Sequence, residues 1–119
     1  MSNEWAEKKF IPLVQNRGSE IIELRGASSA ASAGNAAMEH IRDWVYGTKG
    51  KWTNMAIISD GEYGVPEGLC FSYPVICRHG WYKVVEGLSF NEAGFRRFKN
   101  TIKELKQERD TVAHLLGPN

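Results

Sequence analysis

Ser28 and Ser29 place two adjacent hydroxyls in a stretch of small, uncharged residues, so whatever packs there lies close to them. Residues 26–37 carry no charge and no side chain larger than asparagine. A hydroxyl can donate and accept hydrogen bonds without adding charge. Because alanine favours helix, this stretch predicts a lean helix that packs closely on a partner or borders a small cavity. A local alternative remains open, in which one serine caps the first helical turn.

The three histidines, His40, His79 and His114, do not have the spacing of a metal site. They fall in a predicted helix, a predicted hairpin turn and the last turn of the final helix. A catalytic or metal-binding histidine needs partners that converge on it, and the sequence shows none. We therefore predict separate structural or surface histidines and no metal site.

Glycines and carboxylates in the middle of the chain are better explained by turns than by chemistry. The glycines at positions 61, 64 and 68 have neither the dinucleotide-binding spacing nor the lysine of a P-loop. The acidic pairs Asp60 with Glu62, and Glu86 with Glu92, fall where turns and helix starts use acids. We therefore predict turn glycines and no catalytic carboxylate pair.

Composition describes an ordinary globular chain. It has 119 residues, 42% hydrophobic and 24% charged, with a net charge of +1, which predicts one folded unit and no nucleic-acid partner. The N-terminus does not resemble a signal peptide, and no apolar run is long enough to span a membrane, so we expect a soluble, intracellular protein. Cys70 and Cys77 match no metal spacing, which favours reduced, buried thiols.

Helical periodicity dominates the first half of the chain. Apolar residues at helical intervals predict a helix over about residues 6–24, although Pro12 would move its regular start to about Ile11. Gly26 is a predicted break. The lean helix then runs over about residues 29–46 and ends at Gly47.

Strand signals follow, at residues 52–58, 69–76 and 81–85, separated by turn residues. They predict an antiparallel three-stranded meander. Pro74 lacks an N–H, which places it on an edge, at a bulge or at a position without a ladder hydrogen bond.

The last predicted helix begins after Asn91, a good N-cap, and ends before Gly117 and Pro118. Arg109 interrupts its apolar stripe and should reach solvent or a carboxylate. We predict that this helix lies across the sheet and that its stripe is core. The stripe consists of Phe95, Phe98, Ile102, Leu105, Val112 and Leu116.

Several motifs, in order, resemble the C-terminal part of malate dehydrogenases of the cytosolic and related bacterial type. They are RGASSAASA at residues 25–33, EHIRDW at 39–44, ISDGEYGVP at 58–66, FSYPV at 71–75 and VVEGL at 84–88. The resemblance runs from about Asn3 to Leu116. It implies an α+β fold over residues 1–119, the C-terminal substrate-domain portion of a lactate/malate dehydrogenase. The two N-terminal helices, the meander and the long last helix would form it.

The resemblance also implies what this chain does not contain. The family's NAD-binding Rossmann half, its catalytic His–Asp pair and its substrate arginines match no residue here, so no catalytic or cofactor-binding residue is expected. His40 belongs to a helix pattern of the family instead. Ser28 and Ser29 match the family's serine pair at the wall of the nicotinamide and substrate pocket, where they would shape and orient. Gly34 and Asn35 depart from relatives, which would loosen the helix.

The function implied is that of one portion of an NAD-dependent oxidoreductase that interconverts malate and oxaloacetate in the tricarboxylic acid cycle. We expect a cytoplasmic homodimer when the enzyme is complete, and no turnover from the isolated chain. Two alternatives stay open: a portion of a lactate dehydrogenase of malate dehydrogenase type, and a noncatalytic, self-associating fragment.

Overall fold

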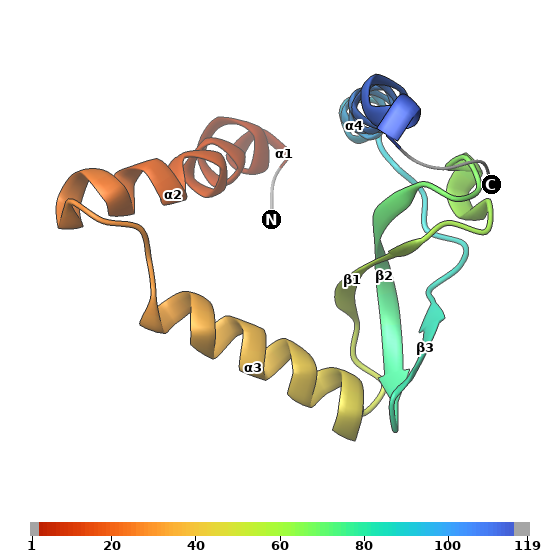
Figure 1. Cartoon of the computed structure of the whole chain (residues 1–119), viewed down its shortest axis with the longest axis horizontal. Helices are drawn as coiled ribbons and strands as arrows, with labels where there is room; N and C mark the ends of the chain where they lie inside the picture. Colours follow the sequence, from red (N-terminus) through yellow and green to blue (C-terminus); the bar gives the residue numbers. More distant parts are fainter. Residues whose placement is uncertain (1–2, 116–119) are drawn as a thin grey trace. The chain divides into compact units, whose positions relative to one another are not determined.

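A computed structural model describes residues 3–115 and divides the chain into two units, residues 1–42 and 43–119. Figure 1 shows the helices of the first unit and the sheet and last helix of the second. The predicted α+β class, with N-terminal helices, an antiparallel meander and a long final helix, is confirmed. None of the helices within residues 3–115 has the length and apolar character needed to cross a bilayer.

The first unit is helical from its start. A short helix α1, Asn3–Trp5, leads into a π-helical turn η1, Ala6–Phe10, and then into α2, Ile11–Arg25. Pro12 lies in the first turn of α2, where its missing N–H breaks no hydrogen bond of that helix. The start near Ile11 is therefore correct for the regular helix.

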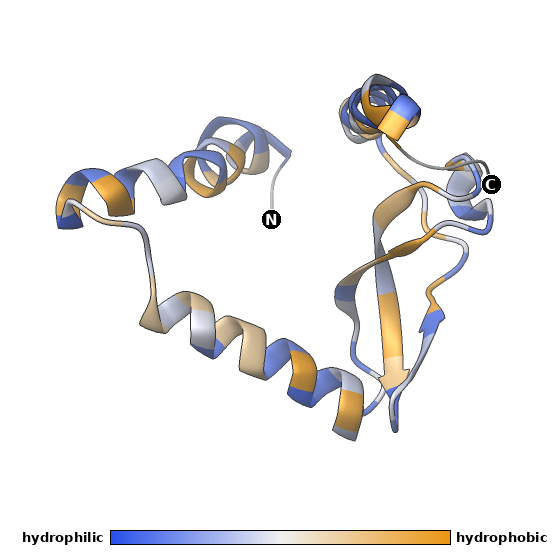
Figure 2. Ribbon diagram, viewed as in Figure 1, coloured by the Kyte–Doolittle hydropathy of each residue, from blue (hydrophilic) through white to orange (hydrophobic). Residues whose placement is uncertain are grey.

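The lean helix α3 spans Ala31–Tyr46, two residues shorter at its start than predicted. Gly47 ends it as expected, with φ of 89° and an N–H that donates to the Asp43 carbonyl at 3.0 Å. Neither α2 nor α3 has a buried side chain. Figure 2 shows hydrophobic turns along both helices, so their apolar side chains lie at the surface of the described chain.

The second unit contains the three-stranded antiparallel sheet. Its strands are β1, Thr53–Ile58, β2, Cys70–Arg78, and β3, Trp81–Val84, in the order β1-β2-β3. Buried and exposed residues alternate along β1 and β2, so one face of the sheet is core. The buried hydrophobic residues are Met55, Ile57, Val65, Leu69, Phe71, Tyr73, Val75, Cys77 and Ile102.

Helix α4, Glu92–Val112, contributes to this core and is followed by a 3-10 turn η3, Ala113–Leu115. Asn91 caps it as predicted, because its side chain accepts from the Gly94 N–H at 2.7 Å. Arg109 pairs with the Asp110 carboxylate at 3.2 Å.

The prediction that the whole apolar stripe of α4 is core is only partly correct. Ile102 is buried, and Phe98 and Leu105 pack against the same cluster. Phe95 and Val112, by contrast, are 50% and 42% exposed, because only the middle of the helix covers the sheet. The predicted end of the stripe and the Gly117–Pro118 stop lie outside the described residues.

The two cysteines are both free, but they differ in burial. Cys77 points into the core, and burial, followed by the charge of Asp43, raises the pKa of its thiol. Cys70 is exposed, so the prediction of two buried thiols is wrong for this residue. The alternation along β2 explains the difference, since seven positions separate the two residues and place them on opposite faces.

The loop from β1 to β2 is held by a buried polar network. The Tyr73 hydroxyl donates to Ser59 Oγ at 2.7 Å, and Ser59 in turn donates to the Val65 carbonyl and accepts from the Gly61 N–H, both at 3.1 Å. Ser59 and Tyr73 are each only 1% exposed. Burial is the main cause that raises the pKa of the Tyr73 phenol above its usual value.

Pro74 lies in the central strand, so the edge position considered for it is wrong. Its carbonyl accepts from the Val85 N–H at 2.8 Å, one pair beyond the Val75–Val84 end of the β2–β3 ladder. In an antiparallel pair of this kind the second hydrogen bond would run from residue 74 to the Val85 carbonyl. Proline cannot make it, and the Tyr63 hydroxyl donates to Val85 instead. A tyrosine from the loop therefore completes the sheet.

We expect Tyr63→Phe to lower the free energy of unfolding by about 1–3 kcal/mol, because it leaves a part-buried carbonyl without its donor. Urea unfolding followed by circular dichroism measures the change. Tyr82→Phe is the matched control, since Tyr82 is 44% exposed.

A double variant tests whether the stability lost in Tyr63→Phe can be recovered. Adding Pro74→Ala to Tyr63→Phe restores a backbone N–H opposite Val85 and should recover part of the lost stability. Equal losses in Tyr63→Phe and Tyr82→Phe would contradict the role assigned to Tyr63.

Candidate functional site

Residues 26–30 join α2 to α3 and carry both predicted site residues; we name them the serine connector. Its first residue, Gly26, adopts φ of 68° and donates its N–H to the Ile22 carbonyl at 2.8 Å, which ends α2. Arg25, the last residue of α2, donates from Nη1 to the Ser28 carbonyl at 3.1 Å. Two hydrogen bonds with the end of α2, at Gly26 and at Ser28, therefore hold the connector.

The serines do not cap α3. The Gly34 N–H donates to the Ala30 carbonyl at 2.9 Å, so Ala30 occupies the N-cap position and has no hydroxyl to offer. Within residues 3–115, neither Ser28 nor Ser29 uses its hydroxyl in a hydrogen bond. The capping alternative is therefore wrong for both residues, and both hydroxyls are available to a ligand.

The hydrogen bond from Arg25 also orients the connector. A peptide group is planar, so holding the Ser28 carbonyl holds the N–H of Ser29 in the same plane. Ser29 is half-buried while Ser28 is exposed. Such a pair can donate to, or accept from, a polar ligand without contributing charge.

The connector by itself cannot carry out proton transfer. A serine nucleophile needs an adjacent base, and residues 26–30 consist of glycine, alanine and serine. Among residues 3–115, the charged side chain that contacts the connector is Arg25, whose guanidinium offers hydrogen-bond donors and no acceptor. The arrangement can bind and orient, but it cannot deprotonate a hydroxyl.

The other candidate residues lie in separate elements. His40 is exposed on α3, His79 lies in the β2–β3 turn and His114 lies in η3. No group of three or more possible metal ligands forms among residues 3–115. Glu62 accepts from the Asp60 N–H at 3.0 Å, a turn contact. The glycines at 61, 64 and 68 all have positive φ, as turn glycines do.

A dinucleotide does not fit these residues by themselves. The usual site needs parallel strands joined by a helix, with a glycine-rich turn at the helix start. The described strands are all antiparallel, and the sequence has no such glycine pattern. The connector provides no substitute for that glycine-rich turn.

Sequence reasoning identified the serines but missed the parts that hold them. The sequence predicted a break at Gly26 and assigned no role to the Arg25 side chain. The signal that joins them is the order arginine, glycine and then serine after a helical run, because a left-handed glycine turns the chain back toward the preceding side chain.

Comparison with known proteins matches residues 1–116 to the lactate/malate dehydrogenase, alpha/beta C-terminal domain. The chain is 47% identical to malate dehydrogenase from Naegleria fowleri, with a TM-score of 0.89 over 95% of this chain and 35% of that one. It is 30% identical to Trichomonas vaginalis lactate dehydrogenase in complex with NADH and oxamate, with a TM-score of 0.85 over 96% of this chain and 36% of that one. This chain therefore spans about a third of each solved chain.

The left-handed turn of the connector makes a testable contrast between two glycines. Gly26→Ala should destabilise the end of α2 by about 1 kcal/mol, because a side chain at φ of 68° is strained. Gly34→Ala should stabilise α3 by about 1 kcal/mol, because Gly34 lies inside the helix with open space around it. Hydrogen exchange of the α2 and α3 amides measures both effects, and the same sign for both variants would disprove the assigned turn.

Proposed function

Because this chain belongs to the lactate/malate dehydrogenase family, we propose that it is the C-terminal portion of an NAD-dependent malate dehydrogenase. The complete enzyme would interconvert malate and oxaloacetate, with hydride transfer to and from NAD. The observation that carries the proposal is the serine connector, whose two unused hydroxyls are held in place at a helix end.

Identity supports malate over lactate. The chain shares 47% of its residues with the malate dehydrogenase and 30% with the lactate dehydrogenase, at nearly equal coverage. A lactate dehydrogenase of malate dehydrogenase type is the alternative within the same family. Substrate preference in an oxidoreductase depends on contacts to the distinguishing group of the substrate, here a second carboxylate.

In this proposal Ser28 and Ser29 form part of the wall of the nicotinamide and substrate pocket. Their hydroxyls would hydrogen-bond to the substrate or the nicotinamide carboxamide and so fix its orientation. Arg25 and Gly26 would keep the two serines in place. Cofactor binding, proton transfer and the grip on the substrate carboxylates would come from the rest of the enzyme.

The compartment and partners follow from the same proposal. We place the enzyme in the cytoplasm, which agrees with two free cysteines, one of them exposed. The net charge of +1 supports no nucleic-acid partner. We further propose a homodimer that uses the apolar residues exposed on α2 and α3, among them Leu13, Val14, Met38 and Ile41.

Mixing this chain with the separately produced N-terminal portion tests the proposal. We expect the mixture, but neither part alone, to oxidise reduced nicotinamide in the presence of oxaloacetate. Replacing both Ser28 and Ser29 by alanine should lower kcat/KM by about tenfold to a hundredfold, as expected for one or two lost hydrogen bonds. Ser32→Ala, in the same lean stretch but inside α3, is the control and should change kcat/KM less than twofold.

Three results would decide against it. Turnover by the isolated chain would show that the missing groups are not needed. Activity of the mixture with pyruvate but not oxaloacetate would favour the lactate dehydrogenase alternative. Equal kcat/KM for the double alanine variant and Ser32→Ala would remove the serines from the pocket wall.

A noncatalytic, self-associating fragment is the second candidate, and the exposed apolar residues of α2 and α3 favour it. Light scattering of the 119-residue chain should then show a dimer that Ile41→Lys weakens and Tyr82→Lys leaves unchanged. Ile41 is 56% exposed on α3 and Tyr82 is 44% exposed on β3. A compact monomer that binds little apolar dye would exclude self-association.

A further inference from the structure

Two tight turns in the second unit share an unusual choice of residue. Residues 48–51 form one, with Lys49 at φ of 52° and Gly50 at 79°; the β2–β3 hairpin forms the other, with His79 at φ of 49° and Gly80 at 81°. Positive φ at both central residues defines a type I′ turn. Each turn therefore places a basic side chain at its first central position.

Backbone preference does not explain Lys49. Type I′ turns favour asparagine, aspartate or glycine at that position, because most side chains are strained at positive φ. Lysine has no such preference, whereas histidine, like asparagine and aspartate, is enriched at positive φ. Strained residues of this kind persist where the surrounding structure holds them, often at binding sites.

Hydrogen bonds tie the first turn to the end of β2. The Thr48 N–H donates to the Cys77 carbonyl at 3.0 Å, and the Cys77 N–H donates to Thr48 Oγ1 at 3.1 Å. Gly47 lies so close that a Cβ there would be 3.0 Å from the Cys77 carbonyl oxygen. Only glycine permits this approach, so the first turn is fixed against the strand.

The hairpin turn is held as firmly. Trp44 donates from Nε1 to the Gly80 carbonyl at 2.7 Å, and the Gly80 N–H donates back to the Trp44 carbonyl at 3.0 Å. Both turns are thus anchored to one rigid framework, which lowers the entropic cost of binding a ligand between them.

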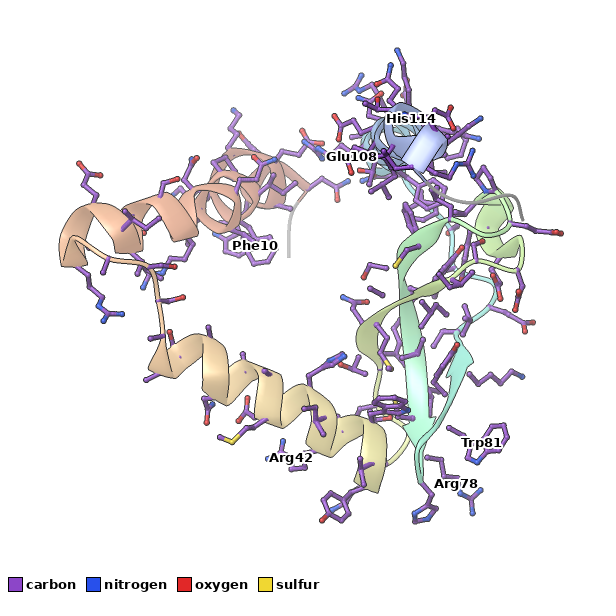
Figure 3. The ribbon with its side chains drawn as sticks, viewed as in Figure 1. Phe10, Arg42, Arg78, Trp81, Glu108 and His114 are labelled. Atoms are coloured by element: carbon purple, nitrogen blue, oxygen red, sulfur yellow. The ribbon has the colours of Figure 1, made fainter. Side chains whose placement is uncertain are left out.

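A cavity of about 320 Å³ lies between the two turns, and we name it the turn cavity. Its basic side chains are Lys49, Arg78 and His79, and its described lining includes no carboxylate. Figure 3 shows Arg78 at the hairpin end, beside Trp81. The remaining lining residues are Tyr46, Gly47, Gly50, Ile76 and Cys77.

The negative charge of Asp43 reaches the wall of this cavity. Asp43 raises the pKa of the lining residue Cys77, although burial of the thiol contributes more. A bound anion must tolerate that charge, and the charged groups of Lys49 and Arg78 line the cavity itself.

We propose that the turn cavity binds the phosphate group of a small phosphate monoester. The planar fork of Arg78 suits two phosphate oxygens, Lys49 supplies a compact charge, and His79 can donate from its ring. The volume is at the lower end of the range for small-molecule sites, which suits a compact ester. This site belongs to the second unit and does not depend on the function proposed for the serine connector.

Asparagine provides a sharp test, because it removes the charge and suits a type I′ turn better than the native residue. We would titrate the 119-residue chain with glycerol phosphate and with inorganic phosphate at constant ionic strength, and follow backbone amide shifts of residues 47–50 and 77–80. Lys49→Asn and His79→Asn should each weaken glycerol phosphate binding by about tenfold, as expected for a lost charge-assisted hydrogen bond. Lys103→Gln on α4 is the matched control and should change binding less than twofold.

Thermal denaturation separates binding from folding, since both asparagine variants should melt at or above the parental temperature. If either variant melts lower, Arg78→Gln, which leaves the turn residues intact, takes its place with the same expected loss. Unchanged affinity in these variants would overturn the proposal. Malate binding as tight as glycerol phosphate would overturn the phosphate assignment, and tighter binding of inorganic phosphate would overturn the ester.

Discussion

A helix in water needs a surface on which to bury its apolar side, and α2 and α3 find none among the described residues of their own unit. Neither helix has a buried side chain, although Leu13, Val14 and Ile41 are large and apolar. Isolated helices of this length are marginal in water, so the order of the serine connector between them depends on what covers them. The two solved relatives are chains about three times longer than this one.

The second unit follows a different principle, because its sheet and α4 bury a core of their own. Its loops are then fixed by polar groups that are paired inside that core. Ser59 and Tyr73 are almost fully shielded from solvent, yet the hydroxyl of each has a hydrogen-bond partner. Burying these polar groups therefore costs little free energy. The two type I′ turns are likewise anchored by Trp44 and Thr48. A unit with its own core can therefore present binding surfaces, with Trp44 at the end of α3 holding one of the two turns.

Local patterns were enough to predict the elements, because helix periodicity, strand alternation and caps are properties of neighbouring residues. Asn91 and Gly47 show this well, since each acts within one helical turn. Contacts between residues distant in the sequence could not be predicted in this way. The place of Pro74 in the central strand depends on Tyr63, which is distant in sequence and supplies the missing donor. The availability of the serine hydroxyls likewise depended on Ala30, because nothing in the sequence shows which residue begins the helical hydrogen bonding.

The partnership of Tyr63 with Val85 also constrains the order in which the molecule can assemble. A hairpin closes rapidly from its turn outward, and β2 and β3 can pair in this way from Arg78–Trp81 to Val75–Val84. The next rung has only one of its two hydrogen bonds until the β1–β2 loop has folded, because its second donor is a side chain 22 residues away. Pairing of β2 with β3 is therefore expected to stop at Pro74. The last rung should form only after the β1–β2 loop has folded, which is a slower step because it joins residues distant in sequence.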